Sequence, residues 1–171
     1  MLEKYAYICY RPKIAFLLWI AVFTAWFVSV FSVIRELCLV NACRDTASFT
    51  IFGVNMGWFG IAYFSFIPLL LYFRRRHHWL DWVLSATVFA GIGAELRLLW
   101  IQKYIIGGWC PLCVTICCAL FVTAMLLLIE KVPGARSGED NGKILAGWTA
   151  FVLIMIALGL VIAVIGVHAL T

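Results

Sequence analysis

Charge is what this chain has least of: Asp, Glu, Lys and Arg make up 12% of its 171 residues, against 65% hydrophobic residues. So few polar side chains cannot cover the surface of a soluble globule of this length, which excludes the soluble classes. The mean hydropathy is +1.06, and several uncharged apolar runs approach the length of about 20 residues that a membrane-spanning helix needs. We therefore predict an all-α integral membrane protein with one compact domain over residues 1–171.

Several other signals are missing as well. The chain has no motif for haem, flavin or nucleotide binding, no internal repeat and no low-complexity tract. No Ala-x-Ala-like cleavage site follows the first apolar run, so we expect that run to be a retained span rather than a removed leader. The net charge of +5 does not indicate a nucleic-acid partner, because the Lys and Arg residues stand in short blocks between apolar runs. Such blocks are topology signals.

Apolar runs predict five membrane spans. They lie at residues 14–34, 51–73, 82–101, 110–129 and 144–167, and a polar loop at about 35–50 follows the first. A cytoplasmic N-terminus puts nine Lys and Arg residues on the inner side and three on the outer side, in keeping with the positive-inside rule. The inner residues are Lys4, Arg11, Lys13, Arg74, Arg75, Arg76, Lys131, Arg136 and Lys143, and the outer ones are Arg35, Arg44 and Lys103. The polar loop and the turn before the fourth span then share the outer face.

Two cysteine pairs fall on that outer face. Cys38 and Cys43 lie in the polar loop, and Cys110 and Cys113 form a Cys-x-x-Cys at the start of the fourth span. The outer side is the oxidising compartment, where disulfides form and persist. Because Pro is favoured at the first helical position, we expect Cys110 to be an N-cap, with Pro111 after it and Cys113 in the first turn. Backbone N–H groups and the helix dipole would then stabilise a thiolate at Cys113.

Two dithiols that can meet permit a relay, because exchange proceeds by thiolate attack on a disulfide through a mixed-disulfide intermediate. A static disulfide in each loop is the alternative. Electrons delivered to a dithiol inside a membrane protein need an acceptor, and a diffusible membrane quinone is the remaining candidate when haem, flavin and nucleotide motifs are missing. The other three cysteines, Cys9, Cys117 and Cys118, are interpreted as apolar helix residues or inert thiols.

Three segments carry a family resemblance. They are residues 95–115, which include Glu95, Gln102 and the Cys-x-x-Cys, the Cys38-x4-Cys43 pair, and residues 53–60 with the sequence Gly-Val-Asn-Met-Gly-Trp-Phe-Gly. Together they resemble the vitamin K epoxide reductase family over roughly residues 14–130. The resemblance implies a four-helix bundle around a quinone pocket, to which the last predicted span adds a fifth transmembrane helix.

The same resemblance implies a role for each paired cysteine. Cys113 would face the quinone, Cys110 would be its resolving partner, and Cys43 would exchange with Cys110. Cys38 would exchange with the external partner. The implied function is that of a quinone-dependent thiol–disulfide oxidoreductase, which reoxidises a thioredoxin-like protein and supports disulfide formation outside the cytoplasm. Its quinone would be of the ubiquinone, menaquinone or vitamin K type.

Two further features of the sequence indicate the kind of partner protein and the kind of membrane. Relatives can carry a fused thioredoxin-like domain after the fifth span, whereas this chain ends at Thr171. We therefore expect a separate thioredoxin-like (DsbA-like) partner. The loop lengths and the lack of a retention-like tail favour a bacterial inner membrane, with lipid around the spans.

Four more residues are candidates for the quinone site. Ser48 lies close to where the family often has a Ser after the second loop cysteine, and Asn55 stands where the family often has a Pro. Asn55 could donate a hydrogen bond to a quinone carbonyl, or it could be a helix N-cap. Cys117, one turn after Cys113, could line the pocket or pack as a small apolar residue. Glu95, which is expensive inside a bilayer, could handle protons or make an interhelical hydrogen bond or ion pair.

Two rival functions stay open from the sequence. One is a soft-metal transporter or sensor that uses the cysteine pairs as ligands, although transport through a relay of ligand pairs favours pairs at both faces of the membrane. The other is a structural assembly partner with static disulfides. Neither rival would transfer electrons from a dithiol to a quinone.

Overall fold

Five long helices dominate the structure, a computed structural model that describes residues 12–36, 49–74, 76–131 and 140–169. The helices are α1 (Pro12–Glu36), α3 (Met56–Phe73), α4 (His78–Ile101), α5 (Pro111–Lys131) and α6 (Asp140–Gly166). All five are long and apolar enough to cross a membrane, since even the 18 residues of α3 cover about 27 Å. Large apolar side chains such as Phe16, Phe27 and Leu153 are exposed on the helices, as lipid-facing residues are. The prediction of an integral membrane protein built from helices is confirmed.

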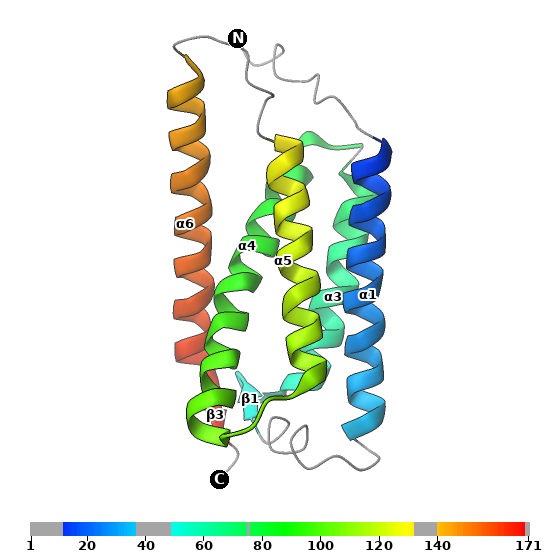
Figure 1. The fold of residues 1–171 in the computed structure, drawn as a ribbon, viewed down its shortest axis with the longest axis vertical. Helices are drawn as coiled ribbons and strands as arrows, with labels where there is room; N and C mark the ends of the chain where they lie inside the picture. Colours follow the sequence, from blue (N-terminus) through cyan, green and yellow to red (C-terminus); the bar gives the residue numbers. More distant parts are fainter. Residues whose placement is uncertain (1–11, 37–48, 75, 132–139, 170–171) are drawn as a thin grey trace.

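Four of these helices share one core. Contacts join α1 to α3, α3 to α4, α4 to α5 and α5 back to α1, so that the helices form a ring. Their buried side chains make one continuous cluster, to which α1 contributes Leu18, α3 Phe64, α4 Phe89 and α5 Leu120. α6 lies outside this ring against α4 (Figure 1). The predicted four-helix bundle with a fifth transmembrane helix is therefore confirmed.

Glycines bring α4 and α6 together. A Cβ atom at Gly159 of α6 would overlap the Ala90 carbonyl oxygen of α4, and one at Gly93 of α4 would overlap the Ile156 carbonyl oxygen of α6. Only glycine allows backbones to approach this closely, and small residues mediate helix packing in membranes for this reason. The fifth helix therefore packs against α4 with the two backbones in close contact at these glycines.

Replacing Gly159 with valine should push α6 away from α4. We expect a loss of about 3 kcal/mol in the free energy of unfolding, at the upper end of the usual cost of overpacking, because the clash is with backbone atoms. Thermal unfolding in detergent would measure this loss. Gly147→Ala is the matched control on the same helix, since a Cβ atom there meets nothing within 4 Å. An unchanged unfolding temperature in Gly159→Val would contradict the close packing.

A small antiparallel sheet, which no sequence pattern indicated, closes one end of the bundle. Its strands are β1 (Phe49–Ile51), β2 (Val54–Asn55) and β3 (Val167–Ala169), in the order β2-β1-β3. Phe52 and Gly53 join β1 to β2 with positive φ angles of 51° and 80°, as a type I′ hairpin turn requires. β3 follows α6 directly and places Val167 opposite Ile51. The sheet thus ties the chain that follows residue 48 to the end of α6.

The end of the bundle that carries the sheet also carries the start of α5. α1 ends and β1 begins there too, at the bottom of Figure 1. These two elements flank residues 37–48, so both flanks of the predicted redox loop lie at the same end as the Cys-x-x-Cys. Cys38, Cys43 and Ser48 themselves lie outside the described residues, and their roles stay predictions.

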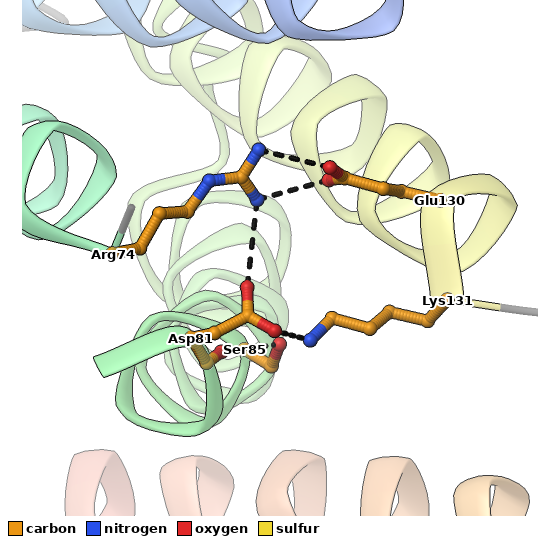
Figure 2. A network of polar contacts seen from close by, with 5 residues as sticks. All are labelled: Arg74, Asp81, Ser85, Glu130 and Lys131. Carbon is orange, nitrogen blue, oxygen red and sulfur yellow. Dashed lines mark hydrogen bonds and ion pairs between the residues drawn. The ribbon is translucent and has the colours of Figure 1, made fainter. Parts of the chain in front are cut away.

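The opposite end holds a cluster of buried charges (Figure 2). Arg74, which follows α3, donates two hydrogen bonds to the Glu130 carboxylate of α5, at 2.9 and 3.0 Å. Asp81 of α4 lies 3.5 Å from the Arg74 guanidinium and pairs with Lys131 of α5. All four side chains are only 6–8% exposed. Two positive and two negative charges compensate one another and link α3, α4 and α5.

Candidate active site

The Cys-x-x-Cys opens α5. Pro111 is the first residue of that helix, and the Cys110 carbonyl accepts a hydrogen bond from the Val114 N–H at 3.1 Å. Cys110 is therefore the N-cap and Cys113 lies in the first turn, as the sequence predicted. Cys110 is 1% exposed, whereas Cys113 is half-buried. Both are thiols and their side chains are neighbours, as in a dithiol that can close to a disulfide.

A π-helical turn, η2 (Gln102–Ile106), sets the position of this dithiol. The turn ends at Gly107, where a left-handed φ of 72° requires glycine. The N–H groups of Gly107 and Gly108 both donate to the Gln102 carbonyl, the second at 3.2 Å. The Gln102 side chain accepts a hydrogen bond from the Cys110 N–H through Oε1 at 3.3 Å. The backbone carbonyl of Gln102 therefore closes the π-helical turn, and its side chain binds the N-cap residue of α5.

A cavity of about 120 Å³ lies beside the dithiol, and all four helices of the bundle line it. Its wall is mostly apolar. The polar side chains on the wall are Ser29, Ser32, Tyr63, Glu95, Cys110 and Cys113, and the apolar ones include Ile51, Met56, Phe59, Phe64, Leu98 and Ile116. Since an apolar cavity of about 150 Å³ holds a benzene molecule, this space suits one small ring.

Tyr63 and Gly91 form one side of the cavity. The Tyr63 hydroxyl donates a hydrogen bond to the Thr87 carbonyl of α4 at 2.8 Å, which directs the ring of this α3 residue toward α4. A Cβ atom at Gly91 would overlap the Tyr63 hydroxyl. Gly91 therefore makes room for Tyr63, and a larger residue at position 91 must displace that ring.

Glu95 and Arg97 lie in the second half of α4 and have different surroundings. Glu95 lines the cavity together with the thiols. The Arg97 guanidinium instead lies 4.5 Å from the centre of the Trp100 ring. Within the described ranges the two residues form no ion pair with each other, in agreement with their i, i+2 spacing. Glu95 thus shares the space next to the dithiol, and Arg97 does not.

Asn55 and Cys117, two of the sequence candidates, are near the cavity but not on its wall. Asn55 is the N-cap of α3, and its Oδ1 accepts a hydrogen bond from the Gly57 N–H at 2.8 Å. This is the helix-capping interaction that the sequence offered as one of two interpretations. Cys117 is buried on α5. A role for either residue toward a quinone stays a prediction.

Sequence reasoning missed several residues of the wall. Ser29 and Ser32 are three apart on α1 and share one helix face, so polar residues spaced this way within an apolar run were a usable signal. Tyr63 and Gly91 left no such signal, because aromatic and small residues are common throughout the spans. Their contribution depends on how α3 and α4 pack.

Cys110 and Cys113, on the wall of the apolar cavity, can carry out thiol–disulfide exchange. A dithiol that closes to a disulfide releases two electrons and two protons, and Glu95 offers a carboxyl group on the same wall. The Cys110–Cys113 pair supplies two soft ligands for a metal. No group of three or more His, Cys, Asp and Glu side chains gathers in the part of the chain that the structure describes.

Comparison with known proteins identifies the family. The model of the vitamin K epoxide reductase family matches residues 41–129, which is more than half of the 171 residues. The matched range includes α3, α4 and the Cys-x-x-Cys at the start of α5. No curated protein and no solved structure is similar enough to the chain to count as a match. The chain therefore belongs to the vitamin K epoxide reductase family, a family of membrane oxidoreductases that link disulfide chemistry to a quinone.

Proposed function

We propose that the chain is a thiol:quinone oxidoreductase that reoxidises a separate thioredoxin-like protein and so supports disulfide formation outside the cytoplasm. Electrons pass from this partner to Cys38 and Cys43, then to Cys110 and Cys113. Each transfer between thiol pairs breaks one disulfide and forms another by thiolate attack. In the last transfer, a quinone of the ubiquinone, menaquinone or vitamin K type takes up two electrons and two protons.

One observation carries the proposal: the dithiol is part of the wall of an apolar, half-enclosed cavity. Binding sites for small molecules are typically of this kind, apolar with a few placed polar groups. The volume of about 120 Å³ fits one ring, and Cys113 is the more exposed of the two thiols. These features support Cys113 as the thiol that faces the quinone.

The burial of Cys110 supports an internal relay. With 1% of its surface exposed, Cys110 is out of reach of a folded external protein. A cysteine of the chain itself must then deliver electrons to it. Cys43 is six residues from the start of β1 at Phe49, so it lies within about 20 Å of that strand even if the chain between them is fully extended. We therefore assign Cys43 to exchange with Cys110, and Cys38 to exchange with the partner.

Proton transfer is assigned to Glu95. Its side chain lines the same cavity as Cys110 and Cys113, so it is placed to take up the protons that dithiol oxidation releases. Tyr63 has a different role, since its hydroxyl proton is engaged with the Thr87 carbonyl. We assign Tyr63 to shaping the ring site rather than to proton donation.

Asn55, Cys117 and Ser48 complete the proposed surroundings of the quinone. Asn55 and Cys117 are each next in sequence to a residue of the wall, Met56 and Ile116. Ser48 directly precedes β1. Asn55 and Cys117 lie toward the cavity end of the bundle rather than the charged end, and Ser48 is next in sequence to a strand at that end. These positions support keeping all three as candidates.

The dithiol end is proposed to face the outside of a bacterial inner membrane, with the N-terminus in the cytoplasm. Arg74, Arg76 and Lys131 lie at or beside helix ends on the opposite side of the bundle. Positive residues favour the inner side of a membrane. In the proposed orientation the thiols face the compartment where disulfides persist.

The experiment that tests the proposal follows quinone absorbance in purified protein. Reduced thioredoxin-like protein is added to the enzyme with a short-tailed ubiquinone, menaquinone or vitamin K analogue, and one quinone should be reduced for each partner dithiol oxidised. A soft-metal binding protein, or one with static disulfides, leaves all three quinones oxidised. That outcome overturns the proposal.

Gly91→Val should weaken quinone binding selectively. The new side chain displaces Tyr63 into the cavity, and an overpacking cost near 1.4 kcal/mol corresponds to a KM for quinone that is about tenfold higher. Disulfide exchange with the partner should proceed at the wild-type rate, because the dithiol is untouched. Steady-state kinetics with each substrate varied separately would measure both quantities. Gly147→Ala, in open space on α6, is the control, and an unchanged KM for quinone in Gly91→Val contradicts the assignment of the cavity.

A further inference from the structure

Gln102 is buried beside the dithiol and only partly hydrogen-bonded. It is 0% exposed. Its backbone carbonyl accepts from the N–H groups of Gly107 and Gly108, and its Oε1 accepts from the Cys110 N–H at 3.3 Å. The remaining polar atom of the side chain, Nε2, has no hydrogen-bond partner among the residues that the structure describes.

Cys113 is the group that this amide can serve. The Gln102 Oε1 reaches the N-cap of α5 at Cys110, Cys113 lies in the first turn of that helix, and the Gln102 and Cys113 side chains are neighbours. A neutral thiol is only a weak acceptor, so it leaves Nε2 without a full hydrogen bond. A thiolate carries a negative charge, and hydrogen bonds to charged groups are about twice as strong as neutral ones. The Nε2 donor therefore gains a strong hydrogen bond when Cys113 becomes a thiolate.

The hydrogen bond from the Cys110 N–H explains the Oε1 end of this side chain but not the Nε2 end. A buried donor without a partner costs free energy. The residue also begins a π-helical turn, a feature that is frequent at functional sites. Both observations point to a use for Nε2 during the reaction.

We propose that Gln102 is a positioning residue for disulfide exchange, whose Oε1 holds Cys110 at the start of α5 and whose Nε2 donates a hydrogen bond to the departing Cys113 thiolate. The inference rests on the proposed function. A thiolate, that of Cys43 in the relay, attacks the Cys110 sulfur; the Cys110–Cys113 bond breaks and a new disulfide forms at Cys110. The electron pair of the broken bond stays on Cys113. The negative charge thus moves from the attacking sulfur to the sulfur beside Nε2.

The test measures the Cys110–Cys113 dithiol–disulfide equilibrium in dithiothreitol redox buffers, in a Cys38→Ser/Cys43→Ser background. Gln102→Glu keeps an oxygen acceptor for the Cys110 N–H but removes the amide donor, and Gln102→Met removes both. Each variant loses the donor that stabilises the Cys113 thiolate, so in buffers alkaline enough to ionise Cys113 each equilibrium should shift about tenfold toward the disulfide, which corresponds to about 30 mV.

Tyr104→Phe is the matched control, because Tyr104 is exposed on the same turn and its variant should keep the wild-type equilibrium. A purely structural role predicts a lower unfolding temperature with no redox shift. An equilibrium constant for Gln102→Glu within about twofold of the wild-type value overturns the inference. This result decides the matter even if Gln102→Met does not fold. No quinone takes part in this measurement, so its outcome is separate from the test of quinone reduction by the wild-type protein.

Discussion

Cys113→Ala is expected to abolish quinone reduction by the reduced partner, with a loss of at least about 10³-fold in the initial rate, as occurs when a covalent nucleophile is removed. The reason is that Cys113 is the half-buried thiol on the cavity wall, and without it the last pair cannot close to a disulfide. Cys110→Ala should cause the same loss. The rate of change in quinone absorbance, measured with each purified variant in detergent, checks this expectation.

The two variants should nevertheless differ in what they accumulate. Cys113→Ala keeps the Cys110 thiol, which can attack the Cys38–Cys43 disulfide of the oxidised protein: that bond breaks, a Cys43–Cys110 disulfide forms and Cys38 is released as a thiol. Because Cys113 is missing, this species cannot pass on to a Cys110–Cys113 disulfide, and it should be visible by mass spectrometry of non-reduced peptides from the variant kept free of reduced partner. Cys110→Ala should give no such species. Cys118→Ala is the matched control, because Cys118 lies on the same helix, is exposed and is not on the cavity wall. Wild-type turnover in Cys113→Ala would sink the assignment of the dithiol.

Arg74→Met is expected to destabilise the fold more than any other change at the charged end of the bundle. It leaves the Glu130 carboxylate, 6% exposed, without the guanidinium that donates two hydrogen bonds to it. Breaking a buried ion pair by removing one partner costs about 3–5 kcal/mol, which corresponds to a fall of roughly 10 °C in the unfolding temperature. Differential scanning fluorimetry in detergent would show this fall.

A double variant distinguishes the lost charge balance from lost packing. Arg74→Met combined with Glu130→Leu removes both members of the pair, while Asp81 keeps its partner Lys131. Replacing a buried ion pair by apolar residues is often close to neutral, so the double variant should recover most of the loss. Arg76→Met, at an exposed position, should unfold like wild type. A cost below about 1 kcal/mol for Arg74→Met would show that the pair behaves like a surface salt bridge.

The membrane spans and the start of α5 could be predicted because both depend on local sequence. An apolar run of about 20 residues specifies a spanning helix without reference to the rest of the chain. Likewise, Cys110 followed by Pro111 supplies an N-cap and a first helical residue from adjacent positions. The hydrogen bond from the Val114 N–H to the Cys110 carbonyl is the predicted outcome.

The role of Asn55 could not be predicted from its neighbours in the sequence. A residue before a helix can cap it or face a ligand, and its type permits both. The structure shows the cap, through the hydrogen bond from the Gly57 N–H. The sheet that contains Asn55 was missed altogether, because β3 follows α6 near the end of the sequence and pairs with the distant strand β1.

By itself, the sequence determined that the chain is a helical membrane protein with a dithiol at the start of one span, since composition, run length and a Pro after Cys110 act locally. Only the tertiary structure decided what surrounds that dithiol. The spans are apolar all round, so no amphipathic stripe says which face turns inward. Tyr63 meets Gly91, and the Gln102 amide meets Cys110, because helix packing and a π-helical turn bring together side chains that the order of residues leaves unrelated.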